Sequence, residues 1–160
     1  MNKISDLKTN SKHYKMFEKC ACICHKSDSL HKHGAIITHG NKIISIGHNH
    51  VRNKLTSITP CLMCQVHAEM YALHNLMRTH KKPTSKRYNM YIARFSNEQF
   101  CNSKPCSDCI ELLLNSDFNI SRIFYTTGDD TYIAERLKDI IPTHTSRGNK
   151  NIKEGTLIMT

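Results

Sequence analysis

The sequence lacks tryptophan, has only six glycines and four prolines, and contains no long uninterrupted apolar run. A helix that crosses a bilayer needs roughly 18 or more consecutive apolar residues, so this absence excludes a helical membrane protein. Residues 1–8 alternate polar and apolar side chains and contain no apolar segment of the kind found in secretory signals. We therefore expect a soluble, cytoplasmic protein with no membrane partner.

Acidic residues are scarce relative to basic ones. The chain has 23 Lys and Arg against 13 Asp and Glu, which gives a formal net charge of +10 at pH 7. Such an excess favours an anionic partner, such as a nucleotide or a nucleic acid. The basic residues are nevertheless spread along the chain, so much of this charge is expected to be solvated surface.

The length and composition are those of one folded domain. The chain has 160 residues, of which 39% are hydrophobic and 22% charged, far from the composition of a disordered protein. No repeat or low-complexity tract divides it. We expect a single domain over 1–160, with a core over about 11–141 followed by a polar C-terminal tail.

Hydrophobic periodicity predicts alternating helices and strands. Helices are expected over 11–26, over 66–79 and after Pro105, strands over 34–38, 42–47, 90–95 and 122–127, loops over 50–60 and 96–104, and a strand or a helix over 131–140. This order predicts an α/β fold in three layers, α/β/α, with a central mixed sheet of about five strands.

Each predicted helix has an apolar face that should pack against the sheet. The three faces consist of Met16, Phe17, Cys20, Ala21 and Cys24 in the first helix, Val66, Met70, Leu73 and Met77 in the second, and Ile110, Leu113 and Leu114 in the third.

The eight cysteines do not suggest a disulfide framework. Export is not expected, and Cys20, Cys22 and Cys24 lie too close together to connect distant segments. Cys20 and Cys24 instead lie on the apolar face of the first helix. Cys106 and Cys109 have the C-x-x-C spacing that indicates metal or redox chemistry in a reducing compartment.

Two short motifs combine into a metal site. His-Ala-Glu at 67–69 begins the second predicted helix, and Pro-Cys-Ser-Asp-Cys at 105–109 begins the third. His67, Cys106 and Cys109 supply one imidazole and two thiolates, three ligands of tetrahedral zinc that leave a fourth position open. Helix N-termini also stabilise thiolates, because their free N–H groups and positive dipole ends face the sulfur atoms.

Glu69 lies two residues after His67, so it can face a metal-activated water without ligating the metal. The H-x-E and P-C-x-x-C motifs resemble the signature of the zinc-dependent cytidine and deoxycytidylate deaminase superfamily. The resemblance covers most of 11–130. It implies that Zn²⁺ is bound by His67, Cys106 and Cys109, and that Glu69 shuttles protons while water attacks C4 of cytosine. It also implies the cytidine deaminase-like fold and a homo-oligomer.

Four further residues are expected to contact the substrate. Asn49 matches the Asn with which family members hold the sugar, although it also suits a turn at a strand end. Ala68 belongs to the first motif, and His48 is expected at the mouth of the site, where it could contact a phosphate. Phe100 could stack on the base, or it could pack locally.

The expected substrate is a pyrimidine nucleotide or nucleoside. Relatives that act on free cytidine usually carry Cys-Ala-Glu, so His67 favours a nucleotide or polynucleotide. Ser107 and Asp108 resemble the deoxycytidylate enzymes, whereas the short 50–65 loop and His50 depart from their pattern.

The excess of positive charge makes a basic rim for a phosphate plausible, and the candidates for it are Arg52, Lys54 and Arg94.

Two alternatives stay open. A tRNA or single-strand deaminase would need the same site beside an open basic channel, and its binding would weaken steeply with salt. A non-enzymatic zinc module would use Cys61, Cys64, Cys106 and Cys109, but the 41 residues between the pairs far exceed the ~15–20 of zinc ribbons. Cys61 and Cys64 could also hold a second zinc with Cys101.

Overall fold

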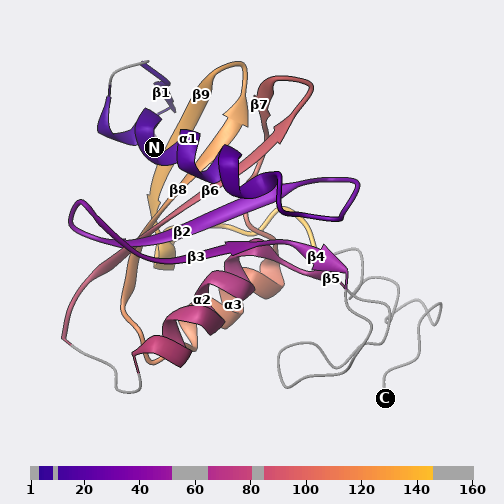
Figure 1. Ribbon diagram of the computed structural model, residues 1–160. Helices are drawn as coiled ribbons and strands as arrows, with labels where there is room; N and C mark the ends of the chain where they lie inside the picture. Colours follow the sequence, from indigo (N-terminus) through magenta and orange to yellow (C-terminus); the bar gives the residue numbers. More distant parts are fainter. Residues whose placement is uncertain (1–3, 9–10, 52–64, 81–84, 146–160) are drawn as a thin grey trace.

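The computed structural model describes residues 4–8, 11–51, 65–80 and 85–145, and the structural statements below concern these residues (Figure 1). Among them, no helix has the length and apolar character needed to span a bilayer.

A mixed seven-stranded sheet forms the centre of the fold. Six strands follow the order β1-β9-β8-β6-β2-β3, and β7 pairs with β6. The bounds are Ile4–Asp6 for β1, His33–His39 for β2, Lys42–His48 for β3, Tyr88–Ser96 for β6, Gln99–Cys101 for β7, Ile120–Gly128 for β8 and Thr131–Arg136 for β9. Strands β6 and β8 pair in parallel, and the other pairs in this sheet are antiparallel. The sheet therefore has more than the expected five strands, because the short β1 and β7 extend it.

Three helices cover the two faces of the sheet, as predicted (Figure 1). Helix α1 (Lys12–Cys24) packs on one face, and helices α2 (Ala68–Thr79) and α3 (Ser107–Leu114) pack on the other. Alternate residues of β6 divide between the two cores: Met90 and Ile92 belong to the α2/α3-side core, and Tyr91 and Ala93 to the α1-side core. The predicted three-layer α/β/α arrangement is confirmed.

Helix α1 lies within the predicted range of 11–26 and buries the predicted face. Ser11 caps its N-terminus by accepting a hydrogen bond from the Tyr14 N–H at 3.1 Å, as N-cap serines do. The buried residues are Met16, Phe17, Cys20, Ala21, Ile23 and Cys24, which contain the whole expected stripe.

The buried faces of α2 and α3 differ from the prediction. Residues 65–66 form strand β5 (Gln65–Val66), paired with β4 (His50–Val51), so α2 begins only at Ala68. The inward face consists of Ala68, Glu69, Ala72, Leu73 and Leu76. Met77 is 53% exposed, and in α3 Leu114 is 51% exposed while Cys109, Ile110 and Leu113 are buried.

The segment predicted as a loop over 96–104 contains a hairpin instead. Asn97 and Glu98 have φ values of 50° and 62°, the left-handed pair that a tight two-residue hairpin turn requires. β7 therefore folds back on β6, with Phe95 opposite Phe100. Over 131–140, where the sequence left strand and helix open, β9 is followed by a short 3₁₀ helix at Leu137–Asp139.

Gly47 permits the close approach of α2 to β3. A Cβ atom at this position would lie 2.3 Å from the Ala72 backbone nitrogen and 2.4 Å from the Ala68 carbonyl oxygen. A side chain there would push α2 away from the sheet. The glycine thus fixes where the first turn of α2, with His67 and Glu69, sits relative to the end of β3.

Candidate metal centre and active site

The two predicted motifs meet at the adjacent N-termini of α2 and α3. His67 is the N-cap residue of α2, Cys106 is the N-cap residue of α3, and Cys109 lies in the first turn of α3. Their donor atoms lie within 4.8 Å of one another. The His67 Nδ1 atom is 3.2 Å from the Cys109 Sγ and 3.5 Å from the Cys106 Sγ. Residues 39 and 42 positions apart in sequence are thereby brought to one point.

The donor set fits a zinc ion. Zinc–nitrogen distances of about 2.0–2.1 Å and zinc–sulfur distances of about 2.3 Å separate nitrogen and sulfur by roughly 3.6 Å in a tetrahedron. The two nitrogen–sulfur distances here, 3.2 and 3.5 Å, are close to that value. One imidazole and two thiols are also the ligand types that zinc prefers. Three protein ligands would leave one position for water or substrate.

The electrostatics of the cluster favour a thiolate at Cys106. A hydrogen bond from Cys109 lowers the pKa of Cys106 to about 4 against the opposing effect of burial, and His67 contributes in the same direction. Burial disfavours the imidazolium, but the hydrogen bond with Cys106 and the charge of Glu69 raise the pKa of His67 to about 9. The hydrogen bond with Cys106 and burial raise the pKa of Cys109 well above its ordinary value.

Glu69 is a buried carboxyl group beside these ligands. It occupies the first turn of α2 and is 6% exposed. Burial raises its pKa, while the charge of His67 and a hydrogen bond with the Cys109 thiol oppose that rise. The neighbouring Ala68 is fully buried. A carboxyl group held in this way can exchange protons with a reactant at the metal centre.

Asn49 lies just beyond β3 and is 3% exposed. Its Nδ2 donates to the His31 carbonyl at 2.6 Å, and its Oδ1 accepts from the His33 N–H at 2.8 Å. The amide thus ties the segment before β2 to the end of β3. A contact between Asn49 and a sugar stays a prediction.

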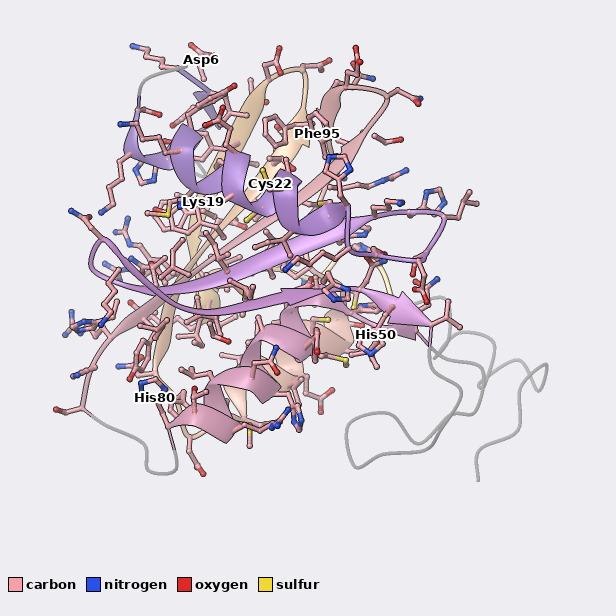
Figure 2. The ribbon with its side chains drawn as sticks, viewed as in Figure 1. Asp6, Lys19, Cys22, His50, His80 and Phe95 are labelled. Atoms are coloured by element: carbon pink, nitrogen blue, oxygen red, sulfur yellow. The ribbon has the colours of Figure 1, made fainter. Side chains whose placement is uncertain are left out.

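His48 belongs to a group of three rings at this end of the sheet. The Tyr71 ring of α2 lies 5.3 Å from the His48 ring and 4.9 Å from the His50 ring, both edge-on. Figure 2 labels His50 next to β4, and His80 at the opposite end of α2. The sequence analysis did not single out Tyr71, whose N–H donates to the His67 carbonyl. Its position four residues after His67 in a predicted helix would have placed it near this end of the sheet.

Phe100 is not at this centre. The ring is 8% exposed and belongs to the α1-side core, edge-on to Phe95 at 5.2 Å and to Phe17 at 6.3 Å. The turn at 97–98 returns β7 onto β6 and directs Phe100 to the face of the sheet away from α2 and α3. Phe100 therefore packs locally in the α1-side core and does not lie where it could stack on a base at the metal centre.

Several sequence candidates lie outside the described residues, namely Arg52, Lys54, Cys61 and Cys64. Cys101 is described, and its Sγ contacts the Gln99 carbonyl at 3.8 Å. In the described part of the chain, His67, Cys106 and Cys109 form the one group of three metal-ligating side chains.

The chain matches the family described as "Cytidine and deoxycytidylate deaminase zinc-binding region" over residues 7–127, well over half of its length. No curated protein sequence matches it.

Solved structures with the same fold include cytidine deaminase from Burkholderia pseudomallei, at 16% identity and a TM-score of 0.61, covering 82% of this chain and 98% of that one. A mutant cytidine deaminase from Mycobacterium tuberculosis has 14% identity and a TM-score of 0.56, covering 88% and 99%. dCMP deaminase from cyanophage S-TIM5 has 17% identity and a TM-score of 0.49, covering 74% and 84%.

Proposed function

Since this chain belongs to the cytidine and deoxycytidylate deaminase family, we propose that it is a zinc-dependent hydrolase that deaminates a cytosine nucleotide or nucleoside. The product is the uracil form, with release of ammonia. One observation carries the proposal: the His67, Cys106 and Cys109 donor atoms converge within 4.8 Å, next to the buried carboxyl group of Glu69.

Three residues would bind the metal, and a fourth, Glu69, would transfer protons. Zinc held by His67, Cys106 and Cys109 would supply a Lewis acid that makes water nucleophilic near neutral pH. Glu69 accepts a proton from the attacking water and delivers it to N3 of cytosine. A C–O bond forms at C4. Glu69 then takes the proton of the new C4 hydroxyl group and transfers it to the amino group, so that the C4–N bond breaks, ammonia leaves and the C4 carbonyl of uracil forms.

The remaining predicted contacts place the substrate. In this proposal Ala68, at the start of α2, contacts the substrate, and Asn49, at the end of β3, contacts the sugar. His48 lies at the mouth of the site, where it contacts a phosphate. The preferred substrate is a deoxycytidylate-like nucleotide. His67 replaces the cysteine usual in relatives that act on free cytidine, which favours a nucleotide or polynucleotide, and Ser107 and Asp108 resemble the deoxycytidylate enzymes. We also propose a cytoplasmic homo-oligomer, on the family resemblance.

Ammonia release from zinc-loaded protein tests the proposal. The substrates are dCMP, CMP, cytidine, deoxycytidine and a deaminable tRNA anticodon stem. The test variant is Glu69→Gln, and the matched control is Glu111→Gln, which removes an exposed carboxyl group of α3. Loss of a general acid–base residue lowers turnover by about 10²- to 10⁴-fold. We expect that loss in Glu69→Gln with its zinc retained, and none in the control.

Full turnover in zinc-loaded Glu69→Gln would contradict the proton-transfer role. Activity on the RNA alone would favour the second candidate, a tRNA or single-strand deaminase, for which the net charge of +10 is the supporting observation. No turnover of any of the five substrates by zinc-loaded protein would contradict the proposed activity.

A further inference from the structure

Arg94 lies at the same end of the sheet as the metal centre and on the same face. In β6 it continues the row of Met90 and Ile92, which belong to the α2/α3-side core. It pairs with His33 at the beginning of β2. Residues opposite one another in an antiparallel pair point to the same face, so Arg94 and His33 both face the α2/α3 side.

The guanidinium group of Arg94 has unused hydrogen-bonding capacity. One terminal nitrogen lies 2.9 Å from the His31 Nδ1, whereas the buried Nε has no hydrogen-bond partner. No carboxylate of the described residues forms an ion pair with it. A guanidinium group presents five N–H donors in a planar fork that matches the oxygens of a phosphate. Because its buried Nε has no partner and no carboxylate of the described residues pairs with it, this guanidinium group is suited to bind an external anion.

The segment that carries His31 and His33 is held in place. The Asn49 amide binds the His31 carbonyl at 2.6 Å and the His33 N–H at 2.8 Å, which fixes both histidines relative to the end of β3. The Asn49 N–H also donates to the His33 carbonyl at 3.3 Å. Gly47, two residues before Asn49, lies against the Ala68 carbonyl in the first turn of α2, so His33 and the metal centre lie at the same end of the sheet.

We infer that Arg94, with His31 and His33 beside it, binds the phosphate of a cytosine mononucleotide whose base lies at the His67–Cys106–Cys109 centre. This inference rests on the proposed function and narrows it to nucleoside monophosphates. In addition to its proposed contact with the sugar, Asn49 would position the histidines that flank the phosphate.

Substrate discrimination tests the inference. The measurement is kcat/KM for dCMP and for deoxycytidine in wild-type protein, Arg94→Gln, Arg94→Lys and the control Arg122→Gln. Arg122 is exposed on β8, pairs with Asn89 of β6 and Arg136 of β9, and carries the same charge. Arg94→Gln removes charged hydrogen bonds to the phosphate. We therefore expect it to lower the ratio of kcat/KM for dCMP to kcat/KM for deoxycytidine by on the order of 10- to 100-fold. Arg94→Lys should lower it less, and Arg122→Gln should not change it.

An unchanged ratio in Arg94→Gln would overturn the inference, as would equal losses on both substrates. So would a wild-type preference for a single-stranded oligonucleotide over dCMP, because the site would then bind a phosphodiester.

A binding measurement separates this inference from the proposed activity. Titration calorimetry of zinc-loaded protein should show tighter binding of dUMP than of deoxyuridine, and phosphorus NMR should show binding of inorganic phosphate. Both preferences should be lost in Arg94→Gln and kept in Arg122→Gln. If wild-type protein turned over no substrate but kept these Arg94-dependent preferences, the activity would fail and the phosphate site would stand. Equal binding by Arg94→Gln and wild-type protein would overturn the site.

Discussion

The two faces of the sheet both carry cysteines, but these thiols meet different surroundings. On the α1 side, the Cys20 thiol donates to the Tyr91 carbonyl and the Cys24 thiol to the Ala93 carbonyl, each at 3.5 Å. Burial raises the pKa of Cys24 to about 12 and that of Cys20 well above its ordinary value. On the other side, the hydrogen bond from Cys109 lowers the pKa of Cys106 to about 4.

The side-chain partners of Cys106 explain how it differs from the two α1 cysteines. Cys20 and Cys24 lie in the second half of α1, where the helix's own N–H groups are already paired, and their thiols donate to carbonyl oxygens of β6. Cys106 and Cys109 lie at the start of α3, where backbone N–H groups have no partner within the helix and His67 is adjacent. Cys106 has a second thiol and a histidine as partners and a low pKa, whereas the hydrogen bond with Cys106 and burial raise the pKa of Cys109.

The largest expected effect comes from replacing a cysteine of the metal centre, compared with replacing a cysteine of α1. Cys106→Ser should lose zinc and lower turnover by more than about 10³-fold, because a Lewis-acid metal contributes several kcal/mol to the barrier. Atomic absorption and ammonia release measure the two effects. Cys22→Ser, at the exposed α1 cysteine labelled in Figure 2, is the control and should change neither. Stoichiometric zinc in Cys106→Ser would contradict the ligand assignment.

The next effect compares two close helix–sheet contacts. In Gly47→Ala the new Cβ would lie 2.3 Å from the Ala72 nitrogen, and in Gly34→Ala it would lie 2.3 Å from the Cys20 carbonyl oxygen. Each should lower the free energy of unfolding by about 3 kcal/mol through overpacking. Only Gly47→Ala should also lower kcat per folded molecule, because it displaces the start of α2.

Urea unfolding of the zinc-loaded variants measures these losses. Gly40→Ala is the control for backbone strain alone, because Gly40 has a φ of +59° and no atom within 4 Å of its added Cβ. It should cost about 1 kcal/mol. Equal kcat in Gly47→Ala and Gly34→Ala would refute the special role of Gly47.

A smaller effect is expected within the α1-side core. Cys20→Ala removes a fully buried sulfur and its hydrogen bond to the Tyr91 carbonyl, so it should lower the free energy of unfolding by about 2 kcal/mol. Zinc content and kcat should match those of the wild-type protein. A loss of zinc would show that the two cysteine groups are not independent.

The smallest expected change in the free energy of unfolding comes from a substitution of Phe100, which distinguishes packing from base stacking. Phe100→Leu should lower the free energy of unfolding by about 1 kcal/mol, since the ring packs against Phe17 and Phe95. KM for the substrate should not change. A raised KM at unchanged stability would favour base stacking over packing.

Much of the fold was predictable because local patterns matched the final packing. The Met16-to-Cys24 stripe and the hairpin around Gly40 depend on near neighbours in sequence, and both formed as expected. The predicted face of α2 did not form, because the small residues Ala68 and Ala72 pack against Gly47 of β3 and the predicted Met77 stays exposed. The side to which Phe100 turns depended on left-handed backbone at Asn97 and Glu98, which sequence periodicity does not report.

The chemical groups of the site are readable from the sequence: the imidazole of His67, the thiols of Cys106 and Cys109, the carboxyl group of Glu69, and the family to which these motifs belong. These follow from residue types at short spacings, which are local properties. The convergence of the two motifs within 4.8 Å, and the position of Arg94 beside His33 at the same end of the sheet, depend on the folded chain. Convergence depends on strand order and register, because these bring together residues that are distant along the chain.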